Sequence, residues 1–164
     1  IVLFAIPWTA FALFWIAGLL LVARVGLRAW ETGRPVETKD LVQWRPVAGA
    51  EAEAKRAGKP VLYDFTAAWC PPCRKLAKEV FGDADGAKLL NEGFVPVRVM
   101  DRSREDGKNP PEVGALQKRF GIEAFPTLVI VAAGAKPVVI QGYAGKAGTL
   151  EALKGAIKKE PAAR

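Results

Sequence analysis

The two cysteines of the chain, Cys70 and Cys73, lie within a single motif, WCPPC at residues 69–73. The stretch before the motif, KPVLYDFTA at residues 59–67, is a short apolar run of β-branched and aromatic residues, which is typical of a buried strand. The stretch after it, RKLAKEVF at residues 74–81, places apolar residues at helical spacing. The sequence therefore predicts two cysteines one helical turn apart, where a buried strand passes into a helix.

Composition excludes several kinds of chemistry. The chain contains no histidine, which rules out a Ser-His-Asp triad, a Cys-His protease and a zinc site with imidazole ligands. Two cysteines are too few for a four-thiolate metal site within one chain. We therefore expect neither a bound metal nor a cofactor. The length of 164 residues allows one ordinary domain and an additional segment.

Three interpretations of the cysteine pair remain open on spacing alone. A structural disulfide would close a loop of only four residues, which constrains the unfolded chain weakly. Half of an intermolecular metal site would require a dimer. A redox-active dithiol fits the strand-to-helix context best, because a helix N-terminus lowers the pKa of Cys70 and makes it a nucleophile. Cys73 is then expected to be the more buried, resolving thiol, and Pro71 is tolerated because the first helical N–H groups lack partners anyway.

The remaining pattern predicts an α/β sandwich around one mixed β-sheet flanked by helices. A parallel strand–helix–strand unit is followed by a hairpin and a closing amphipathic helix. The expected helices are residues 50–58, 74–81, 87–91, 112–120 and 149–159, and the expected strands are residues 59–67, 94–101, 126–132 and 138–143. Residues 101–111 (DRSREDGKNPP) are expected to form a polar loop.

The N-terminal stretch, residues 1–23, carries no charge. As a helix it would be about 34 Å long, against a hydrocarbon core of about 30 Å. Arg24 and Arg28 follow it, with Trp30 just beyond, which suits a membrane–water interface. We therefore predict a transmembrane helix bound by membrane lipid. A cleaved signal peptide fits less well, because its apolar region would be shorter. A buried helix of a soluble domain also fits less well, because little follows that could enclose it.

The expected organisation is thus a span over residues 1–23, a basic linker or tether over 24–47, and a domain over 48–160. The linker contains mixed charges and is expected to end in a short strand near Trp44, or to be plain linker throughout. The net charge of +7 lies entirely after the span and could favour anionic headgroups or acidic partners. No run of Lys and Arg with interleaved aromatics suggests nucleic acid.

The segment YDFTAAWCPPCR at residues 63–74 resembles the active-site segment of the thioredoxin superfamily. Residues 125–127 (FPT) resemble that family's cis-proline motif, and Gly142 falls near the end of the last strand. The longer stretch at residues 53–81 is most similar to the thioredoxin-like domains that end DsbD-type transmembrane electron transporters. TlpA-like membrane-anchored reductases share WCPPCR. The resemblance covers residues 48–160 and implies a thioredoxin-like fold.

The resemblance also implies roles for individual residues. Cys70 would attack a substrate disulfide, Cys73 would resolve the mixed disulfide, and Asp64 matches the family's buried acid, which moves a proton for the inner cysteine. Pro126 would be cis, where a substrate segment can pair as an added strand. The expected substrate-binding residues are Trp69, Pro71, Pro72, Phe125, Pro126 and Thr127.

Two departures from the family pattern are expected. Thioredoxin has a lysine that pairs with the buried acid, and the alignment places Val97 at that position. Arg98 is then expected to point to the other face of the strand. The loop at residues 101–111 is longer than in thioredoxin itself and follows the strand edge that carries the dithiol. This loop is expected either to shape the choice of partner or to be a solvated insertion.

These patterns predict a membrane-anchored thiol–disulfide oxidoreductase that reduces protein disulfides. Pro71 and Pro72 offer no N–H to a thiolate, which favours a reducing couple, nearer to about −270 mV than to about −120 mV. Its partners would be disulfide-bonded proteins and a membrane or thioredoxin-type electron donor, with roles in cell redox homeostasis or cytochrome c maturation. The alternative is a non-catalytic interaction or copper-handling module on the same fold, although copper-delivery relatives typically add a histidine ligand.

The compartment is predicted from the anchor. An anchored thioredoxin-like domain is expected on the periplasmic or outer side of the inner (cytoplasmic) membrane, because disulfides persist there. The basic residues after residue 23 favour the opposite orientation under the positive-inside rule.

Overall fold

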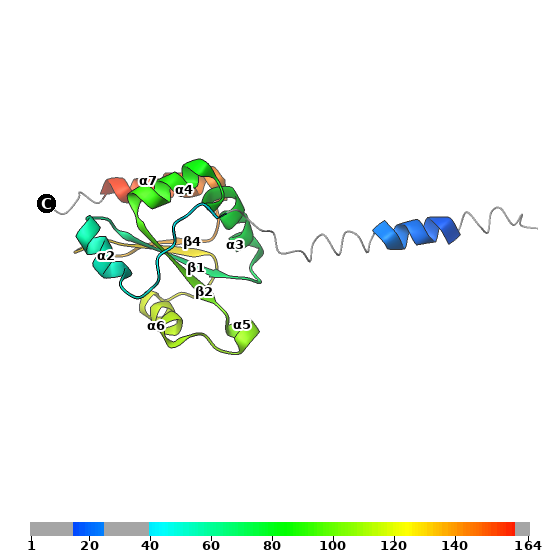
Figure 1. Cartoon of the computed structure of the whole chain (residues 1–164), viewed down its shortest axis with the longest axis horizontal. Coiled ribbons are helices and arrows are strands. Elements are labelled where there is room, and N and C mark those ends of the chain that lie inside the picture. Colours follow the sequence, from blue (N-terminus) through cyan, green and yellow to red (C-terminus); the bar gives the residue numbers. More distant parts are fainter. Residues whose placement is uncertain (1–14, 25–39, 160–164) are drawn as a thin grey trace, which may run out of the picture. The chain divides into compact units, whose positions relative to one another are not determined.

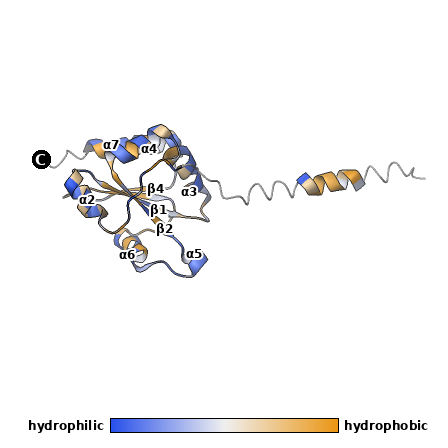
Figure 2. Cartoon of the chain, in the orientation of Figure 1, coloured by the Kyte–Doolittle hydropathy of each residue, from blue (hydrophilic) through white to orange (hydrophobic). Residues whose placement is uncertain are grey.

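The computed structural model describes residues 15–24 and 40–159 (Figure 1). The chain divides into two units, Ile1–Glu37 and Thr38–Arg164, which are described separately. In the first unit, residues 15–24 form a helix that is hydrophobic along most of its length (Figure 2). No helix among the described residues has both the length and the apolar character needed to cross a membrane. Residues 1–14 of the predicted span and residues 25–39 of the predicted tether lie outside the described part.

The second unit is built on one four-stranded mixed sheet with the strand order β2-β1-β3-β4. The strands are β1 (Val61–Ala67), β2 (Val95–Asp101), β3 (Thr127–Val131) and β4 (Val138–Gln141). β1 pairs with β2 in parallel and with β3 antiparallel, and β3 and β4 form a hairpin. This arrangement confirms the predicted strand–helix–strand unit followed by a hairpin. The predicted strand near Trp44 is reduced to one parallel bridge, between Arg45 and Val97.

The helices follow the predicted order, with η1 and α5 in addition. They are α2 (Ala50–Ala57), α3 (Pro71–Leu76), the π-helix η1 (Ala77–Phe81), α4 (Ala84–Gly93), α5 (Ser103–Asp106), α6 (Pro111–Phe120) and α7 (Gly145–Lys159). The regular helix predicted after the cysteines widens into η1. The short helix predicted at 87–91 begins earlier, because the Asp83 side chain accepts the Gly86 N–H and caps it. The predicted polar loop contains α5.

Helices cover both faces of the sheet (Figure 1). Side chains of α3, η1, α4 and α7 pack on one face against Leu62, Leu128 and Ile130. Side chains of α2 and α6 pack on the other face, against Tyr63 and Phe65 among others. Alternate residues of a strand point to opposite faces, so the buried side chain of Asp64, two residues after Leu62, faces the layer that contains α3.

Candidate active site

The two cysteines form a disulfide at the start of α3, with Cα atoms 5.3 Å apart. Cys70 is the N-cap residue, and its Sγ accepts the backbone N–H of Cys73 at 3.3 Å. Pro71 and Pro72 occupy the first two helical positions and have no N–H to donate. Among the first three residues of α3, Cys73 alone therefore supplies an N–H to the sulfur.

Both cysteines are buried in this disulfide form, which corrects one expectation. Cys70 is 2% exposed and Cys73 is 4% exposed, so Cys73 is not the more buried of the two. Ala67 belongs to the same buried cluster, and Phe125 packs against that cluster from the β3 side. The prediction considered only depth along the helix, whereas Phe125, distant in sequence, packs against the cluster that contains both cysteines.

The predicted substrate-binding residues gather around the disulfide. Trp69, 36% exposed, meets Phe125 edge to face with ring centroids 5.9 Å apart. The Phe125–Pro126 peptide bond is cis, as the family resemblance implied. Thr127 is buried and donates its hydroxyl to the carbonyl of Ala124 at 2.8 Å. Pro71 and Pro72 remain exposed at the rim.

Gly142 fixes the segment that carries the cis-proline. Its N–H donates to the carbonyl oxygen of Pro126 at 2.8 Å, and its φ of 76° lies in the left-handed region that favours glycine. The end of β4 therefore supports the segment beside the disulfide.

Arg98, rather than Val97, lies beside the buried acid. The parallel register pairs Asp64 with Arg98 and Tyr63 with Val97, and Arg98 Nε lies 3.4 Å from Asp64 Oδ2. The sequence prediction had the register shifted by one residue, and such a shift moves a side chain to the opposite face of a strand. A cation therefore occupies the position that the prediction left apolar.

The environment of Asp64 favours its neutral form. The residue is 1% exposed, and Oδ1 has no hydrogen-bond partner within the described part of the chain. Burial raises the pKa of Asp64 to about 6; Arg98 opposes the rise, and the nearby negative charge of Asp40 adds to it. An acid with a pKa near 6 exchanges its proton readily in the neutral range.

Asp40 and Trp44 complete a cluster around Arg98 that the sequence analysis missed. Arg98 Nη1 lies 2.5 Å from Asp40 Oδ2, and the Trp44 indole N–H donates to the same oxygen at 2.8 Å. The Arg98 guanidinium lies 4.1 Å from the centre of the Trp44 ring. Asp40 and Arg98 are 58 positions apart, so no local pattern could have revealed the contact. Arg98 is shared between a buried acid and a partly exposed one.

The loop at 101–111 is held at its base by Asp101. This buried carboxylate accepts hydrogen bonds from Ser103, Asn109 and Gln117. Burial alone would raise the pKa of Asp101, but these hydrogen bonds outweigh it and hold the pKa at about 2. In α5, the Arg104 guanidinium lies over the Trp69 ring, 3.5 Å from its centre. The loop at 101–111 therefore contacts Trp69 at the rim of the site.

No metal site is evident in the part of the chain that the structure describes. Among residues 15–24 and 40–159, no three or more His, Cys, Asp or Glu side chains are grouped so as to hold an ion. The chemistry available at the site is that of a disulfide, a buried carboxyl group and an aromatic rim.

A family model described as a thioredoxin-like domain matches residues 47–157. The chain belongs to this thioredoxin-like family. It is 37% identical over 82 residues to thioredoxin H4 of Arabidopsis thaliana, covering 50% of this chain and 59% of that one. It is 28% identical over 156 residues to the thiol:disulfide interchange protein DsbD of Yersinia enterocolitica, covering 88% of this chain and 25% of that one.

Solved structures agree with the thioredoxin-like fold. A thioredoxin from Thermus thermophilus superimposes with a TM-score of 0.61 at 28% identity, covering 72% of this chain and 88% of that one. The chain spans 59% of the length of thioredoxin H4 and 25% of that of the Yersinia DsbD. The DsbD alignment takes in about 144 residues of this chain (88% of 164), and only 118 residues follow position 46. The likeness to DsbD therefore includes residues N-terminal to the family match.

Proposed function

We propose that this chain is a membrane-linked thiol–disulfide oxidoreductase that reduces protein disulfides through Cys70 and Cys73. The observation that carries the proposal is the Cys70–Cys73 disulfide at the N-cap of α3, with Phe125 packed against it. The thioredoxins and DsbD proteins among the relatives support the same reaction class.

The proposed reaction is an exchange of one disulfide for another. The Cys70 thiolate attacks one sulfur of the substrate disulfide, whose S–S bond breaks, and the released substrate thiolate takes up a proton. Cys73 then loses its proton and attacks the Cys70 sulfur, which frees the second substrate thiolate and forms the Cys70–Cys73 disulfide. Two electrons pass from the protein dithiol to the substrate. An external dithiol donor of the membrane or thioredoxin type returns them.

Asp64 is proposed to accept the proton of Cys73. Its side chain faces the helical layer that contains α3, and its Oδ1 atom has no hydrogen-bond partner among the described residues. Because burial raises the pKa of Asp64 to about 6, the carboxyl group can take up and release a proton near neutral pH. Arg98 holds the other oxygen of the same carboxyl group.

The direction of electron flow is proposed to be towards the substrate. A thiolate at Cys70 is stabilised by the N–H groups that reach it, and Pro71 and Pro72 provide none. A weakly stabilised thiolate leaves the reduced form the less favoured one, which makes the couple a better reductant. We expect a reduction potential below about −220 mV when the chain is equilibrated with glutathione.

Residues 1–23 are proposed to anchor the chain in the inner membrane, with the thioredoxin-like domain on the periplasmic or outer side. Support comes from 23 uncharged residues in a row and from the reach of the DsbD alignment beyond the family match. Disulfide-bonded proteins outside the cytoplasm are the substrates that this placement would offer.

The test is to trap the intermediate. In Cys73→Ala, Cys70 can still attack a substrate disulfide, but no second thiol is present to release the substrate. A reductase should therefore accumulate mixed disulfides with its substrates, which dithiothreitol reduces. Cys70→Ala is the matched control. It should accumulate no mixed disulfides, because the remaining thiol, that of Cys73, resolves mixed disulfides and does not attack substrates. If Cys73→Ala traps no protein, the proposal is wrong and a docking module is the better description.

A further inference from the structure

The rim of the disulfide carries two arginines without a carboxylate partner. Arg104 lies over the Trp69 ring at 3.5 Å, and Arg74 Nη1 donates to the Ala68 carbonyl at 3.0 Å. Neither guanidinium lies within 4.0 Å of an acidic side chain in the described part of the chain. Arg102, in the same insertion as Arg104, is by contrast paired with Asp106 at 2.7 Å.

The position of Arg104 is determined by the insertion. Ser103, immediately before it, is bonded to Asp101 through both its N–H and its hydroxyl, and Asn109 closes the loop from the other side. Arg102 N–H also donates to Asn109 Oδ1 at 2.7 Å. These contacts hold α5 beside the site before any partner arrives. A preorganised cation loses less conformational entropy on binding than a free arginine side chain does.

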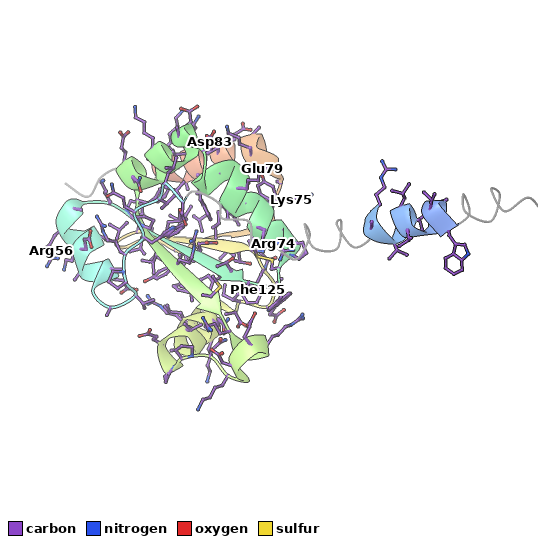
Figure 3. All side chains as sticks on the ribbon, turned by 45° about the vertical axis from the view of Figure 1, so that its right-hand side comes forward. Arg56, Arg74, Lys75, Glu79, Asp83 and Phe125 are labelled. Atoms are coloured by element: carbon purple, nitrogen blue, oxygen red, sulfur yellow. A yellow bond between two sulfur atoms is a disulfide. The ribbon has the colours of Figure 1, made fainter. Side chains whose placement is uncertain are left out.

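The contact with Trp69 involves the guanidinium carbon of Arg104, 3.5 Å from the ring centre, and no ion pair of Arg104 is found in the described part of the chain. A guanidinium that lies flat on an indole uses one face for the ring, while its N–H donors point outward in the plane. A carboxylate matches that fork of donors. The Trp69 ring beneath Arg104 lies next to Phe125, which packs against Cys70 and Cys73. A substrate group bound at Arg104 would therefore lie near Cys70, the cysteine that attacks the substrate disulfide. Figure 3 shows Arg74 and Phe125 on the same side of the domain.

We propose that Arg104 is a specificity-determining residue that selects disulfide substrates carrying a carboxylate side chain beside the attacked cysteine. The inference rests on the proposed reductase function and adds no step to its chemistry. Neither Glu105, the next residue of α5, nor Glu123, two residues before Phe125, forms an ion pair with Arg104 within 4.0 Å. The insertion thus contributes the charge by which a partner is recognised.

The test uses the full 164-residue chain in non-ionic detergent, reduced beforehand, with three synthetic disulfide peptides. The peptides are identical except for Glu, Gln or Lys beside the first cysteine, and acid-quenched samples give the rate of peptide reduction. We expect the native chain to favour the Glu peptide over the Lys peptide by about tenfold at low salt, since an ion pair replaces a like-charge contact. The preference should shrink as salt is added.

Substitutions in the insertion locate the effect. Arg104→Ala should reduce the preference to about threefold or less, and Arg104→Glu should reverse it. Arg104→Lys keeps the charge without the planar stack and should fall between Arg104→Ala and the native chain. The matched control is Lys108→Glu, the same charge change in the same loop at a side chain with no contact to Trp69; it should alter the preference by less than about twofold.

Two results would overturn the inference alone. One is an unchanged preference in Arg104→Glu, and the other is an equal loss in Lys108→Glu, which would assign the effect to general charge. In both cases the Gln peptide would still be reduced. If no peptide is reduced by any form of the protein, the proposed function fails and the inference fails with it.

Discussion

Replacing Asp64 with asparagine should change how the stability of the domain depends on pH. The folded-state pKa of Asp64 is about 6, against an ordinary value of 3.8, because the carboxyl group is buried. Below pH 3.8 the group is neutral in both the folded and the unfolded chain, and its full contribution to stability is present. As pH rises from 3.8 to about 6, the unfolded chain gives up the proton first, and the folded state loses stability.

The size of this loss follows from the two pKa values. The difference between about 6 and 3.8, at about 1.36 kcal/mol per pH unit, is about 3 kcal/mol. Most of it, more than about 2 kcal/mol, falls between pH 4 and pH 7. Asp64→Asn removes the titrating group. The free energy of unfolding of the variant minus that of the native chain should therefore increase by more than about 2 kcal/mol from pH 4 to pH 7.

Urea unfolding of the disulfide form, followed by tryptophan fluorescence between pH 4 and pH 7.5, measures this difference. The disulfide form is chosen because bonded cysteines do not titrate. Any constant effect of the asparagine amide cancels when the variant-minus-native difference is compared across pH. Asp85→Asn, the same replacement at an exposed carboxylate of α4, is the matched control. A flat difference for Asp64→Asn would refute the assignment of a raised pKa to this buried acid.

Two further predictions concern the surroundings of the site. Asp40→Asn should lower the pKa of Asp64, because it removes a nearby negative charge and leaves Asp64 as the one carboxylate beside Arg98. The loss of stability between pH 4 and pH 7, measured by urea unfolding as above, should therefore be smaller than in the native chain. An unchanged loss would contradict the sharing of Arg98 between the two acids. Gly86→Ala should destabilise the fold by about 1–3 kcal/mol, because a Cβ there would lie 2.1 Å from a backbone carbonyl oxygen of η1. Gly114→Ala, in the open on α6, should instead stabilise the fold by about 0.5–1 kcal/mol, and equal effects at the two glycines would contradict the close approach of α4 to η1.

Patterns within one segment of the chain were predicted correctly from the sequence. The structure confirms the strand before Cys70 and the hairpin of β3 and β4, and it confirms a helix after the cysteines that widens into η1 from Ala77. The cis-proline was implied by the resemblance of residues 125–127 to the thioredoxin cis-proline motif, and it too is confirmed.

Features that depend on contacts between distant segments could not be predicted in the same way. The register of β1 against β2 decides whether Val97 or Arg98 faces Asp64, and hydrophobic alternation along β2 alone did not settle it. The approach of Arg104 to Trp69 depends on how α5 folds within a polar loop whose sequence has no periodicity. The π-helix η1 follows α3 and contacts α4. The sequence pattern of residues 74–81 does not predict that contact.

The segment at residues 40–45 has a practical consequence for anyone who isolates the domain. Leu41 N–H donates to the Phe81 carbonyl at 3.1 Å, and Arg45 N–H donates to the Pro96 carbonyl at 2.7 Å. The family match begins at residue 47, so a fragment cut at that boundary discards both bonds together with Asp40. Arg98 would then face Asp64 alone, and such a fragment should hold a more acidic carboxyl group behind its disulfide than the intact chain does. The residues that affect the pKa of Asp64 thus extend beyond the family match at residues 47–157. A fragment made to study the redox chemistry should therefore start before residue 40.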